Sequence, residues 1–134
     1  MRVMGVEEFN IETDVGGYDC LLSDGSDFSE IEDYFSMMRE LVVFREHVTE
    51  NYDGGGLVVL MDLWVDEEYR GEGHGSALVV EFLGFVRDRG LSHVYLIADE
   101  AVSNEIDLAD WYAGYGFEHV EGHGRFMVLM YRRM

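Results

Sequence analysis

The fold is decided by the stretch Val65-Asp66-Glu67-Glu68-Tyr69-Arg70-Gly71-Glu72-Gly73-His74-Gly75-Ser76. It follows a strand-like apolar run, residues 57–65, and precedes a helix-like run, residues 77–87. Glycines at alternate positions suit neither a helix nor a strand interior. At a strand-to-helix junction, however, they let backbone N–H groups turn toward one point beside the positive end of the helix dipole. The stretch therefore predicts an anion-binding elbow suited to phosphate.

The spacing of the glycines argues against two common phosphate loops. A Walker loop requires Gly-x-x-x-x-Gly-Lys-Ser/Thr, and the chain has no lysine. A dinucleotide loop requires Gly-x-Gly-x-x-Gly directly after the first strand, whereas the order here is Arg-Gly-x-Gly-x-Gly in mid-chain. A dinucleotide-binding protein is therefore disfavoured. A glycine-rich turn without a ligand stays open at this point.

The hydrophobic pattern predicts alternating strands and helices. Two short extended segments, 6–13 and 18–23, flank an expected hairpin turn at Val15-Gly16-Gly17. Apolar residues then recur at three- and four-residue steps over 28–50, which indicates one amphipathic helix, continuous or broken in two. Downstream we expect a strand over 57–65, a helix over 74–89, a strand over 93–98, a helix over 104–115, and strands over 117–121 and 125–132 joined across 122–124. This order predicts an α/β sandwich of three layers with a mixed sheet.

Composition points to a folded protein outside the membrane. With 134 residues and 48% hydrophobic content, the chain is long enough for one domain with a real core. The single Cys20 cannot form an internal disulfide and is interpreted as a structural thiol, and no metal site is expected. No apolar run reaches membrane-spanning length, and the first residues lack a signal-peptide core. We therefore expect a cytoplasmic location and no membrane contact.

Two segments resemble the GCN5-related N-acetyltransferase (GNAT) family. Arg70-Gly71-x-Gly73-x-Gly75 resembles the family's acetyl-CoA-binding signature, and Leu63-Trp64-Val65 resembles the splayed strand before it. Residues 110–117 resemble the Tyr-x-x-x-Gly-Phe ending of the family's fourth helix. The resemblance spans about residues 57–131. It implies a GNAT-like sandwich with a mixed, splayed sheet and an abbreviated N-terminal half.

The resemblance also implies how the chain is organised. Residues 1–134 form one acetyltransferase-like domain. Residues 57–134 are its acetyl-CoA-binding part, and residues 1–56 are a variable part on the acceptor side.

The resemblance assigns cofactor-binding residues. The backbone amides of the elbow would hold the diphosphate of acetyl-CoA, namely those of Gly71, Gly73, His74, Gly75 and Ser76. Arg70 would add a positive charge; its alternative is an exposed salt bridge with Glu67 or Glu68. Backbone groups of Leu63 and Val65 would hold the pantetheine arm and the acetyl carbonyl. Asn104 would contact pantetheine, although its spacing to Tyr112 is one residue longer than usual.

Two catalytic residues are assigned. Tyr112 occupies the family's position for protonating the CoA sulfur, and a phenol is a reasonable donor to a thiolate. The alternative is that Tyr112 is a core aromatic. No general base stands out among 28 acidic residues. We name Asp62 on the splayed strand, the alternative being an outward-facing strand residue.

The function implied is acetyl transfer from acetyl-CoA to a primary amine, either a small cationic amine or a protein amine. The net charge of −19 repels nucleic acid and attracts cations. Four explanations of the acidic, lysine-free composition stay open: high-salt adaptation, substrate steering, mimicry of nucleic acid, and an enzyme without side-chain amines of its own to modify. The alternative function is a catalytically silent acidic GNAT-fold protein that binds a partner by charge mimicry. The family resemblance also suggests a homodimer.

Overall fold

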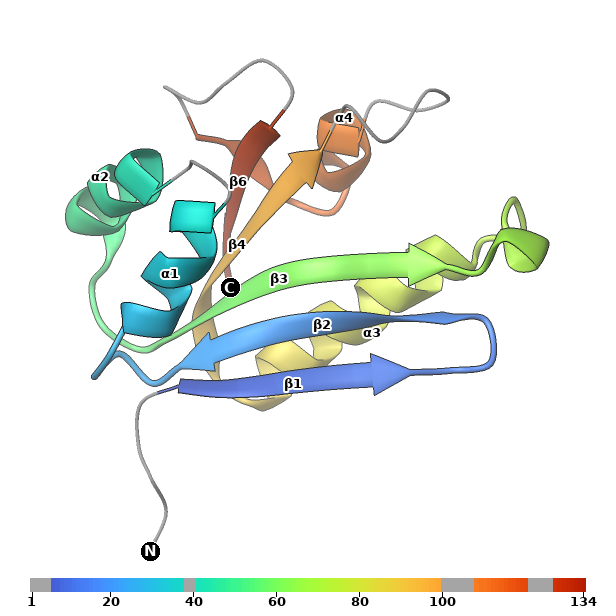
Figure 1. The fold of residues 1–134 in the computed structure, drawn as a ribbon, viewed down its shortest axis with the longest axis horizontal. Coiled ribbons are helices and arrows are strands. Elements are labelled where there is room, and N and C mark those ends of the chain that lie inside the picture. The colour runs from blue at the N-terminus through green and yellow to red at the C-terminus, as the bar shows by residue number, and fades with distance from the viewer. Residues whose placement is uncertain (1–5, 38–40, 100–107, 121–126) are drawn as a thin grey trace, which may run out of the picture.

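The computed structural model describes residues 6–37, 41–99, 108–120 and 127–134, which contain one six-stranded sheet (Figure 1). The strands lie in the order β1-β2-β3-β4-β6-β5. Their bounds are β1 Val6–Glu12, β2 Gly16–Ser23, β3 Gly56–Val65, β4 Leu91–Asp99, β5 Glu118–His119 and β6 Met127–Arg133. β3 and β4 pair in parallel, and the other neighbours pair antiparallel. The mixed sheet predicted from the sequence is confirmed.

Helices cover both faces of the sheet and complete the three predicted layers. α1 (Ser29–Met37) and α2 (Leu41–Asn51) lie on one face, while α3 (His74–Asp88) and α4 (Leu108–Ala113) lie on the other (Figure 1). Each face has its own cluster of buried apolar side chains. Phe82 of α3 is fully buried in one cluster, and Phe35 of α1 is fully buried in the other. The sheet therefore separates two cores.

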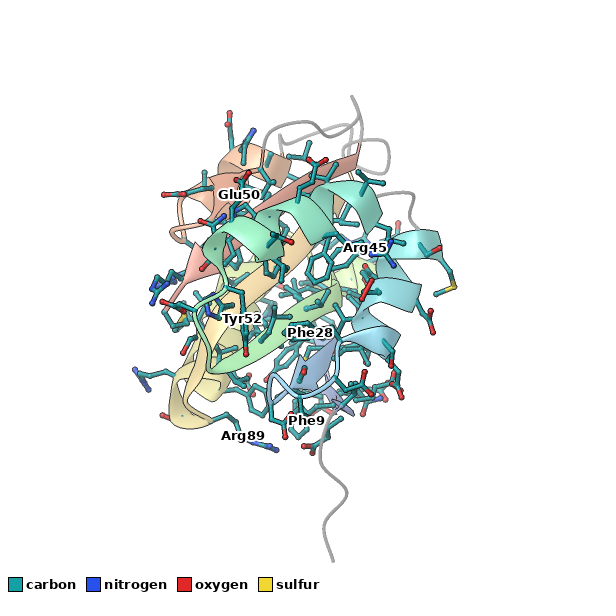
Figure 2. The ribbon with its side chains drawn as sticks, turned by 90° about the vertical axis from the view of Figure 1, so that its left-hand side faces the viewer. Phe9, Phe28, Arg45, Glu50, Tyr52 and Arg89 are labelled. Atoms are coloured by element: carbon teal, nitrogen blue, oxygen red, sulfur yellow. The ribbon has the colours of Figure 1, made fainter. Side chains whose placement is uncertain are left out.

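The amphipathic segment over 28–50 forms two helices, the broken version of the prediction. Phe35 of α1 and Phe44 of α2 stack with ring centroids 4.3 Å apart. The guanidinium of Arg45 also lies 2.5 Å from a carboxylate oxygen of Glu32, and Figure 2 shows Arg45 at the boundary of the two helices. These contacts hold α1 and α2 together over the sheet.

The elements around the elbow follow the prediction closely. The helix expected over 74–89 is α3, and Gly90 ends it with a φ of +69°. The strand expected over 93–98 is β4, which is three residues longer. The last helix is described from Leu108 to Ala113, and Gly116 follows it with a φ of +92°. The turn expected at 122–124 lies outside the described residues.

The first hairpin turns earlier than predicted. Gly16 and Gly17 are not in the turn but at the start of β2, and Thr13 closes the loop by donating its backbone N–H to the Gly16 carbonyl at 2.7 Å. Gly16 and Gly17 are required because backbone atoms of neighbouring strands lie close to them. A Cβ on Gly16 would lie 2.1 Å from the Trp64 carbonyl oxygen, and one on Gly17 would lie 2.1 Å from the Ile11 carbonyl oxygen. From the sequence, the two glycines predicted a turn. In the structure they are needed because the neighbouring backbone leaves no room for a side chain.

β3 and β4 separate halfway along their length. Their parallel pairing runs from Gly56 opposite Leu91 to Leu60 opposite Leu96. β3 continues to Val65 beside β2, while β4 continues to Asp99 beside β6, and the two strands diverge visibly in Figure 1. The register of β2 with β3 shifts at this level: Asp19 faces Asp62, but Cys20 faces Leu60, so Met61 is an extra residue. Such a bulge bends its strand, and it accounts for the splay.

We expect Gly16→Ala to destabilise the fold, because its methyl group would overlap the Trp64 carbonyl oxygen. Overpacking of this kind typically costs about 1–3 kcal/mol. Urea denaturation of the purified protein measures the loss. Gly84→Ala is the matched control, since its methyl group would meet only a side-chain atom of Arg87 at 3.8 Å within α3; it should leave stability unchanged or raise it by about 0.5–1 kcal/mol. Equal effects of the two substitutions would contradict the crowding argument.

Candidate functional site

The elbow presents bare backbone at the start of α3. Gly71 and Gly73 both have a φ of +84°, a conformation that glycine adopts without strain. A Cβ built on either residue meets no atom within 4 Å, so the space in front of them is open. Gly73 is the N-cap of α3 and has no capping side chain. Within the described ranges no acceptor is placed on the first N–H groups of α3, which are therefore available to a ligand or to water.

Arg70 stands beside this loop and is held by the end of β3. Its Nε donates to the Val65 carbonyl oxygen at 3.0 Å. The predicted alternative, a salt bridge with Glu67 or Glu68, is not among the ion pairs of the described residues. His74 lies 3.8 Å from a carboxylate oxygen of Glu72 and is about one-third exposed, as a surface residue would be.

The splay leaves backbone groups of β3 facing the gap. Asp66 donates its backbone N–H to the Val15 carbonyl oxygen at 2.8 Å, so Asp66 and every second residue before it direct their backbone groups toward β2. The backbone groups of Leu63 and Val65 consequently point away from β2. β4 no longer pairs with β3 at this level, which leaves them facing the gap.

Asp62 and Tyr112 are electrostatically coupled across the gap. Asp62 is exposed on β3, as its predicted alternative has it, but partial desolvation of its carboxyl raises its pKa, and Asp19 opposite it adds to the rise, although a hydrogen bond from the Leu63 N–H opposes it. Burial raises the pKa of Tyr112 to about 12, and the negative charge of Asp62 contributes. Tyr112 is 8% exposed on α4. Its hydroxyl is therefore protonated at neutral pH.

Asp19 and Tyr34 are further members of this site that the sequence analysis missed. Asp19 is the one residue of β2 that is not fully buried, and its register places it opposite Asp62. Tyr34 donates its hydroxyl to the Met61 carbonyl oxygen at 3.4 Å. Burial raises the pKa of Tyr34 to about 12, with Asp62 contributing. A lone aspartate in an apolar strand was a usable signal for Asp19; its pairing with Asp62 depends on a register that the sequence does not show.

The remaining assigned residue, Asn104, lies outside the described residues. Cys20 is fully buried, and burial raises the pKa of its thiol to about 12, which fits a structural thiol. Within the described ranges, no three His, Cys, Asp or Glu side chains are placed to hold a metal ion.

Comparison with known proteins identifies the family. The acetyltransferase (GNAT) family matches residues 41–117, which is more than half of the chain. The protein therefore belongs to the GNAT acetyltransferase family. No curated protein matches the sequence. Among the helices of the described residues, none is long and apolar enough to cross a membrane.

Solved structures share the fold at low sequence identity. An acetyltransferase from Bacillus cereus ATCC 14579 is 17% identical, with a TM-score of 0.58 over 96% of this chain and 74% of its own. Arabidopsis thaliana Naa50, in complex with the bisubstrate analogue CoA-Ac-MVNAL, is 20% identical, with a TM-score of 0.55 over 90% and 66%. The mosquito protein "arylalkylamine N-acetyltransferase like 5b" is 13% identical, with a TM-score of 0.64 over 90% of this chain and 68% of its own. These likenesses confirm the GNAT fold predicted from the sequence.

We expect Asp62→Asn to stabilise the fold at neutral pH. Because the pKa of Asp62 is raised in the folded state, ionisation of this carboxyl opposes folding, and a neutral amide removes that penalty. The gain in stability should disappear as pH falls below the usual pKa of aspartate, about 4, because the carboxyl is then protonated in both the folded and the unfolded state. Thermal unfolding at several pH values measures it.

Asp27→Asn is the control with the opposite sign. The Ser29 backbone N–H donates to Asp27 at 2.9 Å and lowers the pKa of its carboxyl, so this variant should lose stability at neutral pH and match the parent in acid. A loss of stability in Asp62→Asn at neutral pH would contradict the raised pKa of Asp62.

Proposed function

We propose that the protein is an acetyl-CoA-dependent N-acetyltransferase that moves an acetyl group to a primary amine by direct attack on the thioester. The observation that carries the proposal is the open glycine elbow at the mouth of the splayed strands, with Asp62 and Tyr112 coupled across the gap behind it. Naa50, which shares the fold, has been solved with an analogue that contains both CoA and a peptide.

The elbow fits the diphosphate of CoA. The amides of Gly71, Gly73, His74, Gly75 and Ser76 surround the start of α3, where an anion is favoured. Arg70 adds positive charge at the same end, and its fork of donors suits phosphate geometry. The gap-facing Leu63 carbonyl and Val65 N–H suit the amides of a pantetheine arm, since the Leu63 N–H is bonded to Asp62 and the Val65 carbonyl to Arg70. When bound, acetyl-CoA supplies the activated acyl group.

Asp62 and Tyr112 each carry out one proton transfer, Asp62 at the amine and Tyr112 at the sulfur. The raised pKa of Asp62 makes its carboxylate a stronger base toward an ammonium group. The freed amine nitrogen forms a bond to the acetyl carbon, the carbon–sulfur bond breaks, and the nitrogen releases its second proton to water. The Tyr112 hydroxyl, protonated at neutral pH, supplies a proton to the departing thiolate and then regains one from water.

The acceptor is a small cationic amine or a protein amine. Asp19 and Asp62 place negative charge on adjacent strands at the gap, and the whole chain carries a charge of −19. Both favour a cation over a neutral or anionic acceptor. Helices α1 and α2 belong to residues 1–56, which we assign to the acceptor side.

Thermal unfolding with and without acetyl-CoA tests the proposal. Binding to the folded state should raise its stability by about 2.7 kcal/mol at a hundredfold excess over Kd. Gly73→Glu should abolish the shift, because a carboxylate would enter the phosphate site. Gly90→Glu is its matched control: Gly90 also has a positive φ and open surroundings, but it lies at the other end of α3, so the shift should persist. No shift in the parent protein at millimolar acetyl-CoA would favour the charge-mimicry alternative.

We also expect CoA binding to tighten as salt rises. The acidic chain repels a polyanion, and that repulsion acts at long range. Between about 0.01 M and about 1 M salt the screening length falls from about 30 Å to about 3 Å, so the Kd for CoA should decrease. Calorimetric titration across this range measures it. S-acetylpantetheine, which lacks the charged nucleotide, is the control whose Kd should not change; weaker CoA binding at high salt would contradict the argument.

A further inference from the structure

Trp111 lies next to both parts of the site assigned above. It is the residue before Tyr112 on α4, and its ring centroid is 4.9 Å from that of Tyr112 and 5.4 Å from that of Tyr115. Both ring pairs are edge-on. Unlike Ala109 and Tyr112, which are buried, Trp111 is only partly buried. Part of the indole therefore remains available for contact.

The edge of the indole that carries Cζ2 and Cη2 lies next to the elbow. A Cβ built on Gly75 would lie 3.6 Å from Cζ2 and 3.7 Å from Cη2 of Trp111, and 3.8 Å from Cγ2 of Val65. Gly75 is in the first turn of α3, and Val65 is the last residue of β3. The indole, carried by α4, thus meets the ends of β3 and α3 at one point.

Packing alone does not account for this placement. The distances at Gly75 are ordinary van der Waals distances, so a methyl group would fit there and bury more of the indole. Glycine instead leaves the ring facing bare backbone. The indole also lies next to both assigned parts of the site, the elbow at Gly75 and the ring of Tyr112. A chain that joins those two parts therefore runs close to it.

We propose that the indole of Trp111 is the wall against which the pantetheine arm of acetyl-CoA packs between α3 and the Tyr112 hydroxyl. This proposal rests on the proposed function. The arm combines methyl and methylene groups with two amides, and a flat aromatic ring offers apolar contact without competing for the backbone groups of Leu63 and Val65. Trp111 is thereby a cofactor-binding residue distinct from those of the glycine elbow.

Tryptophan fluorescence tests the proposal, because the chain has two tryptophans. Trp64→Phe leaves Trp111 as the only indole, and its emission should change and move to shorter wavelength as CoA is added. Trp111→Phe leaves only Trp64, which follows Leu63 on the alternate face of β3 and packs against Gly17; its emission should stay constant. Adenosine 3′,5′-bisphosphate, which lacks the pantetheine arm, should raise the melting temperature without changing Trp111 emission.

Affinity gives the second readout. Trp111→Ala should raise the Kd for CoA about tenfold, as expected when one apolar contact surface is removed, and Trp111→Phe should restore most of the affinity. A constant Trp111 emission at CoA concentrations that raise the melting temperature would overturn the proposal and leave the proposed function intact. An emission change with the bisphosphate alone, or tighter CoA binding by Trp111→Ala, would overturn it as well. Absence of any thermal shift would instead remove the proposed function.

Discussion

The extra residue in β3 at Met61 is the constraint on which the site depends. It shifts the register of β2 with β3 at the level where β3 stops pairing with β4. Each strand keeps its outer neighbour beyond that level, so neither is left without a partner: β3 follows β2 and β4 follows β6. The divergence leaves the Leu63 carbonyl and the Val65 N–H outside the β3–β4 ladder and brings Asp62 to the gap with Asp19 facing it. A regular ladder would have sealed this space.

The site also requires a local region of positive potential in an acidic molecule, so that an anion can bind there. The elbow stretch contains four acidic residues, namely Asp66, Glu67, Glu68 and Glu72. Against them stand the positive end of the α3 dipole and the charge of Arg70. The guanidinium is tied to the Val65 carbonyl rather than to a neighbouring carboxylate. Its charge is consequently not neutralised by an ion pair within the described residues, and it remains next to bare amides.

Sequence reasoning succeeded where local chemistry decides the structure. The alternate glycines, the apolar strand before them and Gly90 after α3 are local signals, and they fixed the elbow and α3 to within a residue. It failed where distant strands meet. Gly16 and Gly17 are required by the approach of Trp64 and Ile11, and Asp19 joins the site through a register shift. Neither relation has a local signature, so the hairpin turn was misplaced and Asp19 and Tyr34 were missed.

The divided ladder has a mechanical consequence. β3 and β4 share no pairing beyond Leu60 and Leu96. The two strand ends can therefore move apart or together by a hinge motion at that level while every strand pair stays intact. Such a hinge motion breaks no strand–strand hydrogen bond and is opposed mainly by side-chain contacts between the two halves. The separation of the two strand ends is therefore set by side-chain packing rather than by the backbone ladder.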